Sequence, residues 1–430
     1  MNDRRLLVVG LLAAWLLVCP RLSSAQNGIT GRSAGLAGSS TGGMFGVYAA
    51  GWNPANLGLK ANPAFGVTFL SVGTSFGNNA FTPEYIGKTF VEGDTLTDEK
   101  IAEILGKVEA NDLGIYGFSG IPILGVSIGP YALNIDGFAL ARGNIASDLL
   151  ALGLRGPVRD EVYRFDDFDL QAMGYVSASF SFAKRLHPSG LLKELSIGAT
   201  FKYISGAGYL DLVEKHGSLQ ITREKISTDG FFKLLESRTG DGVGLDLGVA
   251  TVVEPLDIYC GLTAGNLIGS INWTDVTARE VRFFRDDGLD IDSLTDKRYV
   301  EHLFNQNDTS YSVGSVTSSL PSYILLSVAK ALLGGRVNLY GSYYQGLDDA
   351  PGHSRTPRLA LGSELMFVPL FPVRFGFSVG GTEGFQVSGG FGLKLPGYQL
   401  NVGGSYQRGV FAGAQGLSLA VGNYIGRSSY

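Results

Sequence analysis

Cysteine is almost absent from this sequence. Cys19 and Cys260 are the only two in 430 residues, and Cys19 falls in an N-terminal stretch that resembles a secretory signal. A chain left with one cysteine has no internal disulfide. Small extracellular modules usually depend on several disulfides, whereas bacterial envelope proteins often have none. The scarcity of cysteine therefore excludes a disulfide scaffold and favours a protein of the bacterial envelope.

Long apolar runs are also lacking. After residue 25 no stretch of 18 apolar residues occurs, so the sequence predicts no membrane-spanning helix. The longest run, residues 6–18, follows Arg4 and Arg5 and precedes Ser23-Ser24-Ala25. This order of basic, apolar and small residues predicts a signal peptide over residues 1–25, cleaved before Gln26. Lipid attachment at Cys19 is the alternative, which the bulky Val18 before it disfavours.

Concentrated positive charge is missing. Without residues 1–25 the chain has 31 basic and 38 acidic side chains, and no basic cluster stands out. Nucleic-acid binding requires a concentrated basic face, so we expect no nucleic-acid partner.

Residues suited to catalysis or metal binding are scarce. The four histidines have no metal-ligand or general-base spacing; they are His187, His216, His302 and His353. The pattern G-x-S-x-G occurs four times, but in glycine-rich or strand-like sequence without the helix that a hydrolase elbow requires. An acidic cluster could attract calcium, but its spacing fits no EF-hand and arginines dilute it: Asp286, Asp287, Asp290, Asp292 and Asp296. We predict no enzyme, no cofactor and no metal site.

Glycine and alternating residues are abundant. Gly accounts for 62 residues, and Val373, Phe375 and Phe377 alternate with Arg374, Gly376 and Ser378. A period of two predicts a strand with one apolar and one polar face. The strands predicted in this way are 64–77, 112–129, 131–144, 169–185, 192–208, 242–253, 256–268, 322–332, 336–346, 358–367, 373–382, 383–395, 398–408 and 411–425.

The connections between these strands alternate in length. Short turns such as Gly129-Pro130 and Pro396-Gly397 alternate with long connectors, which are 78–111, 145–168, 209–241 and 269–321. Residues 209–225 of the third connector have strand character, and we expect them to extend a hairpin beyond the membrane. Short periplasmic turns and long extracellular loops are typical of bacterial transmembrane barrels. The sequence therefore predicts an all-β fold, a transmembrane antiparallel up-and-down β-barrel of about 14 strands over residues 64–430, in the bacterial outer membrane. Its terminal aromatic, Tyr430, is typical of clients of the barrel-insertion machinery.

Polar residues on the inner faces of these strands are candidates for the lumen lining. They are Glu364, Arg374, Gln386, Lys394, Gln399 and Asn401. We expect Glu364, Arg374 and Lys394 to form ion pairs inside the barrel, either as a charged constriction or only as charges that face water and each other.

The segment before the first strand has a different composition. Residues 31–58 are rich in Gly and Ala, have few charges and show no strand period. Because small residues let backbones approach closely, we predict that residues 26–63 plug the lumen. Asn53-Pro54 predicts a turn in which the asparagine side chain bonds its own backbone.

A Gly/Ala-rich start followed by Asn53, Pro54 and Ala55 and then the first strand resembles outer-membrane barrels of the FadL type, the long-chain fatty-acid transporters, and related barrels associated with type IX secretion. The resemblance implies a fourteen-stranded barrel with an N-terminal hatch. It further implies external loops that capture a hydrophobic substrate and a break in the wall that releases it sideways into the membrane.

Two functions follow from these patterns. The preferred hypothesis is passive transport of small hydrophobic molecules across the outer membrane, with apolar segments 149–154 and 231–235 as the capture surface. The alternative is a non-transporting barrel that acts as an assembly or secretion partner, with the charged segment 269–321 as its docking surface. The polar inner residues mildly disfavour a continuous apolar tunnel.

Overall fold

The computed structural model describes residues 30–92, 96–108, 112–187, 190–222, 225–254, 256–288 and 305–426. Its strands form one 19-stranded sheet in which all pairs are antiparallel. The sheet closes on itself because β1 and β2, near the start of the chain, both pair with β3 on one side and with the last strand, β19, on the other. The predicted all-β barrel is confirmed, while the predicted signal peptide lies outside the described residues.

The strands have the following bounds: β1 Phe65–Phe69, β2 Val72–Asn78, β3 Leu113–Ile128, β4 Tyr131–Ile145, β5 Val162–Arg164, β6 Asp169–Leu186, β7 Leu192–Ile221, β8 Lys225–Ser237, β9 Thr239–Val253, β10 Ile258–Gly265, β11 Ser270–Gly288, β12 Asn305–Ser319, β13 Tyr323–Leu332, β14 Val337–Gly346, β15 Arg358–Leu365, β16 Val373–Gly380, β17 Gln386–Leu395, β18 Tyr398–Gln407 and β19 Gly416–Gly426.

The assigned strands outnumber the fourteen expected, and local irregularities explain most of the excess. Residues 70 and 71 separate β1 from β2, although both pair with the same neighbours. Similar breaks separate β8 from β9, β10 from β11 and β12 from β13, and β5 is only three residues long. The sequence pattern extends across the first break and counts β1 and β2 as one strand (64–77), whereas β8, β11 and β12 fall in segments that it assigned to loops.

The two faces of the wall differ as the alternation predicts. Leu133, Leu361 and Phe375 are 60%, 63% and 55% exposed on the outside. Their neighbours along the strands, such as Asn134 and Arg374, are buried on the inside. An apolar outer face over a polar, filled interior is the arrangement that a bilayer favours.

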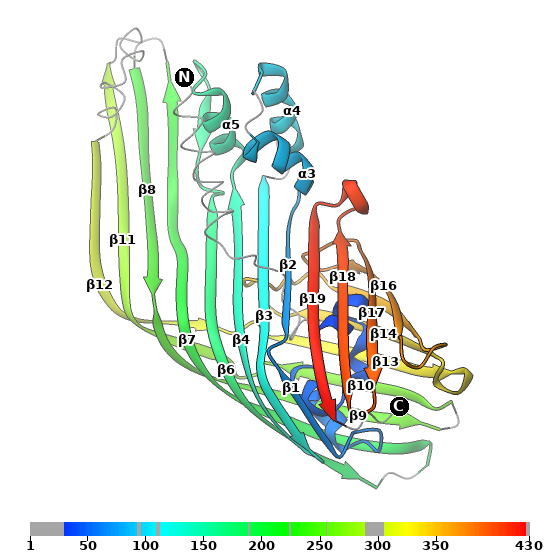
Figure 1. Cartoon of the computed structure of the whole chain (residues 1–430). Helices are drawn as coiled ribbons and strands as arrows, with labels where there is room; N and C mark the ends of the chain where they lie inside the picture. Colours follow the sequence, from blue (N-terminus) through cyan, green and yellow to red (C-terminus); the bar gives the residue numbers. More distant parts are fainter. Residues whose placement is uncertain are drawn as a thin grey trace.

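The wall is much taller on one side than on the other (Figure 1). Strands β7, β8, β11 and β12 extend far above the short strands β13–β19. The strand character expected for 209–225 is confirmed, because β7 continues to Ile221 and pairs with β8. The connectors predicted at 209–241 and 269–321 are otherwise wrong as loops, because β8 spans Lys225–Ser237 and β11 pairs with β8 and β12. Charged cross-strand contacts support this extension: Lys233 on β8 lies 3.1 Å from Glu214 and 3.5 Å from Glu280.

The other two long connectors contain helices. These are α3 Pro83–Ile86, η4 Gly87–Val91, α4 Asp98–Val108 and α5 Ser147–Arg155. Helix α4 begins after Thr97, whose hydroxyl accepts the Lys100 N–H. None of the helices in the described ranges is long and apolar enough to cross a bilayer.

Candidate functional site

The lumen is occupied by residues 30–63, which we call the inner segment (Figure 1, dark blue). It contains α2 Gly31–Gly35 and three short 3-10 helices, η1 Ser40–Gly43, η2 Gly46–Gly51 and η3 Pro54–Gly58. These helices pack on strands around the whole wall: α2 on β16–β19, η1 on β13 and β14, η2 on β3 and β4, and η3 on β6, β7 and β9. The inner segment is thus enclosed by the barrel.

The Asn53-Pro54-Ala55 motif anchors this segment to the wall. Asn53 Oδ1 accepts the Ala55 N–H at 3.0 Å, which caps η3 as the sequence predicts, and Asn53 Nδ2 donates to the Val249 carbonyl of β9 at 3.0 Å. The wall approaches closely here, since a Cβ at Gly198 of β7 would lie 2.5 Å from the Ala55 nitrogen. Only glycine leaves room for the motif at this point.

We expect Gly198→Ala to destabilise the protein by roughly 1–3 kcal/mol, the usual cost of overpacking, because the added methyl collides with inner-segment backbone. Gly208→Ala on the same strand is the matched control, since nothing lies within 4 Å of its added Cβ. Urea unfolding in detergent micelles measures both. Equal effects of the two substitutions would contradict the close approach.

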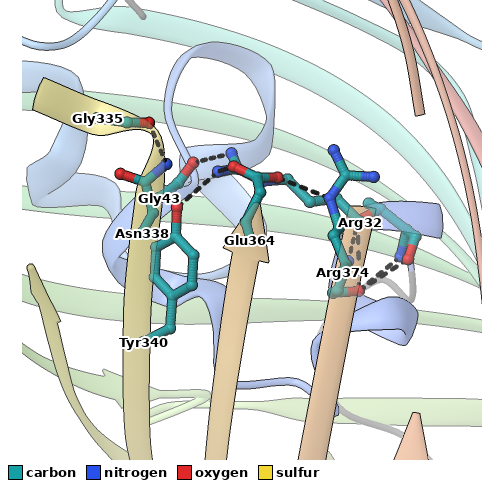
Figure 2. Close-up of polar contacts among 9 residues, drawn as sticks. Arg32, Gly43, Gly335, Asn338, Tyr340, Glu364 and Arg374 are labelled. Carbon is teal, nitrogen blue, oxygen red and sulfur yellow. Dashed lines mark hydrogen bonds and ion pairs between the residues drawn. The ribbon is translucent and has the colours of Figure 1, made fainter. Parts of the chain in front are cut away.

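A buried charge cluster joins the inner segment to the short side of the wall (Figure 2). Glu364 of β15 contacts Arg32 of α2 at 2.9 Å and Arg374 of β16 at 2.6 Å. Arg32 also donates to the Tyr340 hydroxyl at 2.9 Å and to the Gly43 carbonyl. The Glu364–Arg374 contact was expected from the sequence; the role of Arg32 was not, because its partner lies more than 300 positions away in the chain.

The other predicted lumen residues are placed as follows. Gln386 is buried, accepts from Arg358 and donates to Ser405, each at 2.6 Å. Asn401 is buried below α2, where a Cβ at Gly31 would meet its carbonyl oxygen. Lys394 and Gln399 face each other across β17 and β18 and are half-buried. Arg358, which the sequence analysis missed, donates to the Ala37 carbonyl and ties this polar row to the inner segment.

The ladder between the first and last strands is interrupted. Backbone pairing of β1 with β19 stops at Val67, and pairing of β2 resumes at Val72. Side chains bridge this gap, which we call the seam (residues 68–71 opposite 422–424). Asn423 Oδ1 accepts the Phe69 N–H at 3.2 Å, and the Thr68 hydroxyl donates to the Asn423 carbonyl at 2.7 Å.

The inner segment contributes to the seam through Tyr48. Its hydroxyl donates to the same Asn423 carbonyl at 2.5 Å. Burial raises the pKa of Tyr48 to about 12, so the phenol keeps the proton that this hydrogen bond uses. The seam therefore depends on a contact from inside the barrel as well as on the two strands.

A cavity of about 80 Å³ lies between the inner segment and the tall wall. Its residues belong to η2 on one side and to β3, β4, β6 and β7 on the other, and Thr68 of the seam is among them. Apolar and polar side chains both line it, and they include Phe118, Phe138, Leu140, Ile204, Leu320, Asn134, Asp136, Ser177, Ser179 and Lys202. None of these residues was among those that the sequence predicted to line the lumen.

His353, in the loop after β14, also lines the cavity. Its Nδ1 lies 2.5 Å from the Tyr344 hydroxyl, and its ring packs against Tyr323 and Tyr344. Burial, with a smaller contribution from the positive charge of Lys202, lowers the pKa of His353 to about 3. The imidazole is therefore neutral at pH 7. Of the other histidines, His216 packs on Phe231, and His302 lies outside the described residues.

The apolar segments expected to capture substrate at the surface are instead packed against neighbouring parts of the protein. Leu150 and Leu154 of α5 are buried in a cluster with Ile104 of α4. Leu235 belongs to another core cluster, and Phe232 packs against Phe283. The prediction of exposed capture surfaces at 149–154 and 231–235 is wrong, because their apolar side chains hold the upper part of the wall together.

No group of three or more metal-ligating side chains occurs in the described ranges. Of the acidic cluster considered for calcium, Asp290, Asp292 and Asp296 lie outside them.

A closed antiparallel sheet, apolar outside and filled by its own N-terminal segment, defines a transmembrane-type β-barrel with an occupied lumen. Comparison with solved structures gives the particular architecture. The chain is similar to the toluene transporter TbuX of Ralstonia pickettii (14% identity, TM-score 0.52), the toluene transporter TodX of P. putida (10%, 0.54) and the monoaromatic hydrocarbon channel CymD (11%, 0.52). Each match covers 94% of this chain and 99% of the other. The expected resemblance to FadL-type barrels is thereby confirmed for the fold.

Comparison of the sequence with protein families identifies no family of known function. A family model described as a family of unknown function (DUF5723) matches residues 54–237, from the end of the inner segment to the end of β8. No curated protein matches the sequence.

Proposed function

We propose that this protein is a bacterial outer-membrane barrel, exported by a cleaved signal peptide and inserted by the barrel-insertion machinery, that lets small hydrophobic molecules cross the membrane without an energy source. In this proposal the inner segment is a plug that blocks free diffusion of water and ions. The cavity between this segment and the wall binds the molecule in transit.

The position of the cavity is the observation that carries the proposal. It lies inside the barrel, between the inner segment and the wall, and Phe118, Phe138 and Leu140 give it an apolar side. It also reaches Thr68, where the backbone ladder is interrupted. A hydrophobic molecule in this cavity would therefore lie against the seam of the wall. The fold shared with proteins described as toluene transporters supports the same function.

Filling the cavity should block transport. We expect Ser179→Trp, which places a large side chain among the cavity residues, to reduce protein-dependent uptake of radiolabelled toluene by cells with intact lipopolysaccharide. Phe180→Trp is the matched control, because Phe180 is the next residue on β6 and points outward with 43% exposure.

Uptake is measured against cells without the protein, and heat-dependent gel mobility verifies that each variant is folded. If cells with and without the wild-type protein take up toluene and larger hydrophobic compounds at the same rate, the proposal fails. A stable envelope partner that is lost on trimming residues 275–310 would then favour the assembly or secretion role.

A further inference from the structure

The cavity has two chemically different halves, which are built by the same pair of strands. On β4 and β6, Asn134 lies opposite Ser179 and Asp136 opposite Ser177, and the next inward pair is Phe138 opposite Tyr175. The two polar pairs therefore adjoin an aromatic pair along one inner surface. Phe138 lies 5.2 Å from Tyr175 and 6.2 Å from Phe118, measured between ring centroids, so the aromatic half is a continuous group of three rings.

The polar half offers hydrogen-bond acceptors. Asn134 is 8% exposed; its Nδ2 donates to the Val47 carbonyl of the inner segment, and its Oδ1 has no hydrogen-bond partner among the described residues. The nitrogen and oxygen of an asparagine side chain are assigned from its hydrogen bonds. Because a carbonyl only accepts, the Asn134 atom next to the Val47 carbonyl must be Nδ2, and Oδ1 is left without a donor. A buried acceptor without a donor is uncommon and calls for a ligand or water.

Asp136 adds a second acceptor beside it. Its carboxylate lines the cavity and, in the part of the chain that the structure describes, forms no hydrogen bond or ion pair. The nearby cation, Lys202, is already held by Asp246 and Asn266 at 2.8 Å each. Two acceptors thus face the cavity without a cationic or amide donor of their own, and only the serine hydroxyls oppose them across the strands.

We propose that this cavity selects a small aromatic molecule that carries a hydrogen-bond donor, a phenol or an aromatic amine, over a plain aromatic hydrocarbon. The inference rests on the proposed transport function and names its substrate class. The ring packs against Phe118 and Phe138, and the donor reaches Asn134 Oδ1 and Asp136. A hydrocarbon of the same shape would cover these acceptors without bonding them, which a site of this kind disfavours.

The test compares p-cresol with p-xylene, which differ only by a hydroxyl in place of a methyl. Protein-dependent uptake by cells that produce the full chain should favour p-cresol by roughly tenfold, the effect of one buried acceptor left unpaired. Asp136→Leu and Asn134→Leu should bring this ratio close to one. Ile135→Leu, on the outward face between them, should leave the ratio unchanged. A third compound, p-toluidine, tells whether the favoured donor is an amine or a hydroxyl.

A second measurement protects the result against misfolding. Trp52 lines the cavity, so its fluorescence in purified wild-type protein should change on addition of p-cresol and not of p-xylene at equal concentration. Asp136→Asn, which keeps the shape and an acceptor oxygen, should retain part of the preference. Equal uptake of both compounds by the wild type, or a preference for p-cresol that both leucine variants keep, would overturn the inference while the transport function stands. No protein-dependent uptake of either compound would overturn the transport function itself.

Discussion

Deletion of residues 31–56 should raise the conductance of the barrel in planar bilayers by roughly an order of magnitude, because a barrel of this size holds an aqueous channel when nothing fills it. The segment contacts strands around the entire wall, and Met44 and Trp52 pack tightly against Tyr323 and Tyr344. The wall should survive the deletion, since its backbone ladder is formed by its own strands. The seam loses the Tyr48 contact but keeps those between Asn423 and residues Thr68 and Phe69. Inner charges such as Glu364 would then face water, which charged groups tolerate well.

Wild-type protein reconstituted in parallel gives the reference conductance, and heat-dependent gel mobility shows that the deletion variant is folded. A milder variant, Gly376→Leu, should give intermittent openings, because a Cβ there would lie 2.3 Å from the Leu36 carbonyl carbon. A folded deletion variant with unchanged conductance would show that the inner segment is not a plug.

Glu364→Gln should lower the free energy of unfolding by about 3–5 kcal/mol, the usual cost of removing one partner from a buried ionic cluster. Glu364 is the only acid of the cluster and is 3% exposed, so its loss leaves the Arg32 and Arg374 guanidinium groups close together without a counter-charge. The inner segment should detach first, since Arg32 belongs to it. Urea unfolding in micelles measures the change.

Arg374→Met is the informative control for this substitution. It leaves Arg32 and Glu364 as a balanced pair, and Arg374 Nη1 has no hydrogen-bond partner within the described ranges, so less is lost. We expect a clearly smaller destabilisation than for Glu364→Gln. A cost for Arg374→Met as large as that of Glu364→Gln would indicate that packing rather than charge balance sets the stability of the cluster.

The wall was predictable because its signal is local. Arg374 between Val373 and Phe375 reveals its face from immediate neighbours, and the structure places all three accordingly. Apart from residues 209–225, the tall part was mispredicted as loops because its strands are polar on much of their surface and depend on partners such as Lys233 with Glu280 on another strand. No local period reports such a pairing.

The lumen was only partly predictable for a related reason. Its polar residues follow from alternation, but their partners come from the inner segment, hundreds of positions earlier, as Arg32 does for Glu364. The cavity is a space left between distant elements, so no residue pattern along the chain indicates it. The segment that forms α5 was wrongly predicted to capture substrate, because in sequence an amphipathic helix that packs against the protein has the same pattern as one that binds a ligand.

The chain order of these contacts constrains how the molecule is assembled. Arg32 is among the first residues of the inner segment to emerge, yet Glu364 and Arg358, which hold it and Ala37, belong to β15, near the end of the chain. The α2 end of the inner segment therefore cannot reach its partners until the C-terminal strands are in place, whereas η2 and η3 can pack earlier on β3, β4, β6, β7 and β9. Closure of the barrel by β19 and docking of α2 on β16–β19 therefore both depend on the last strands of the chain.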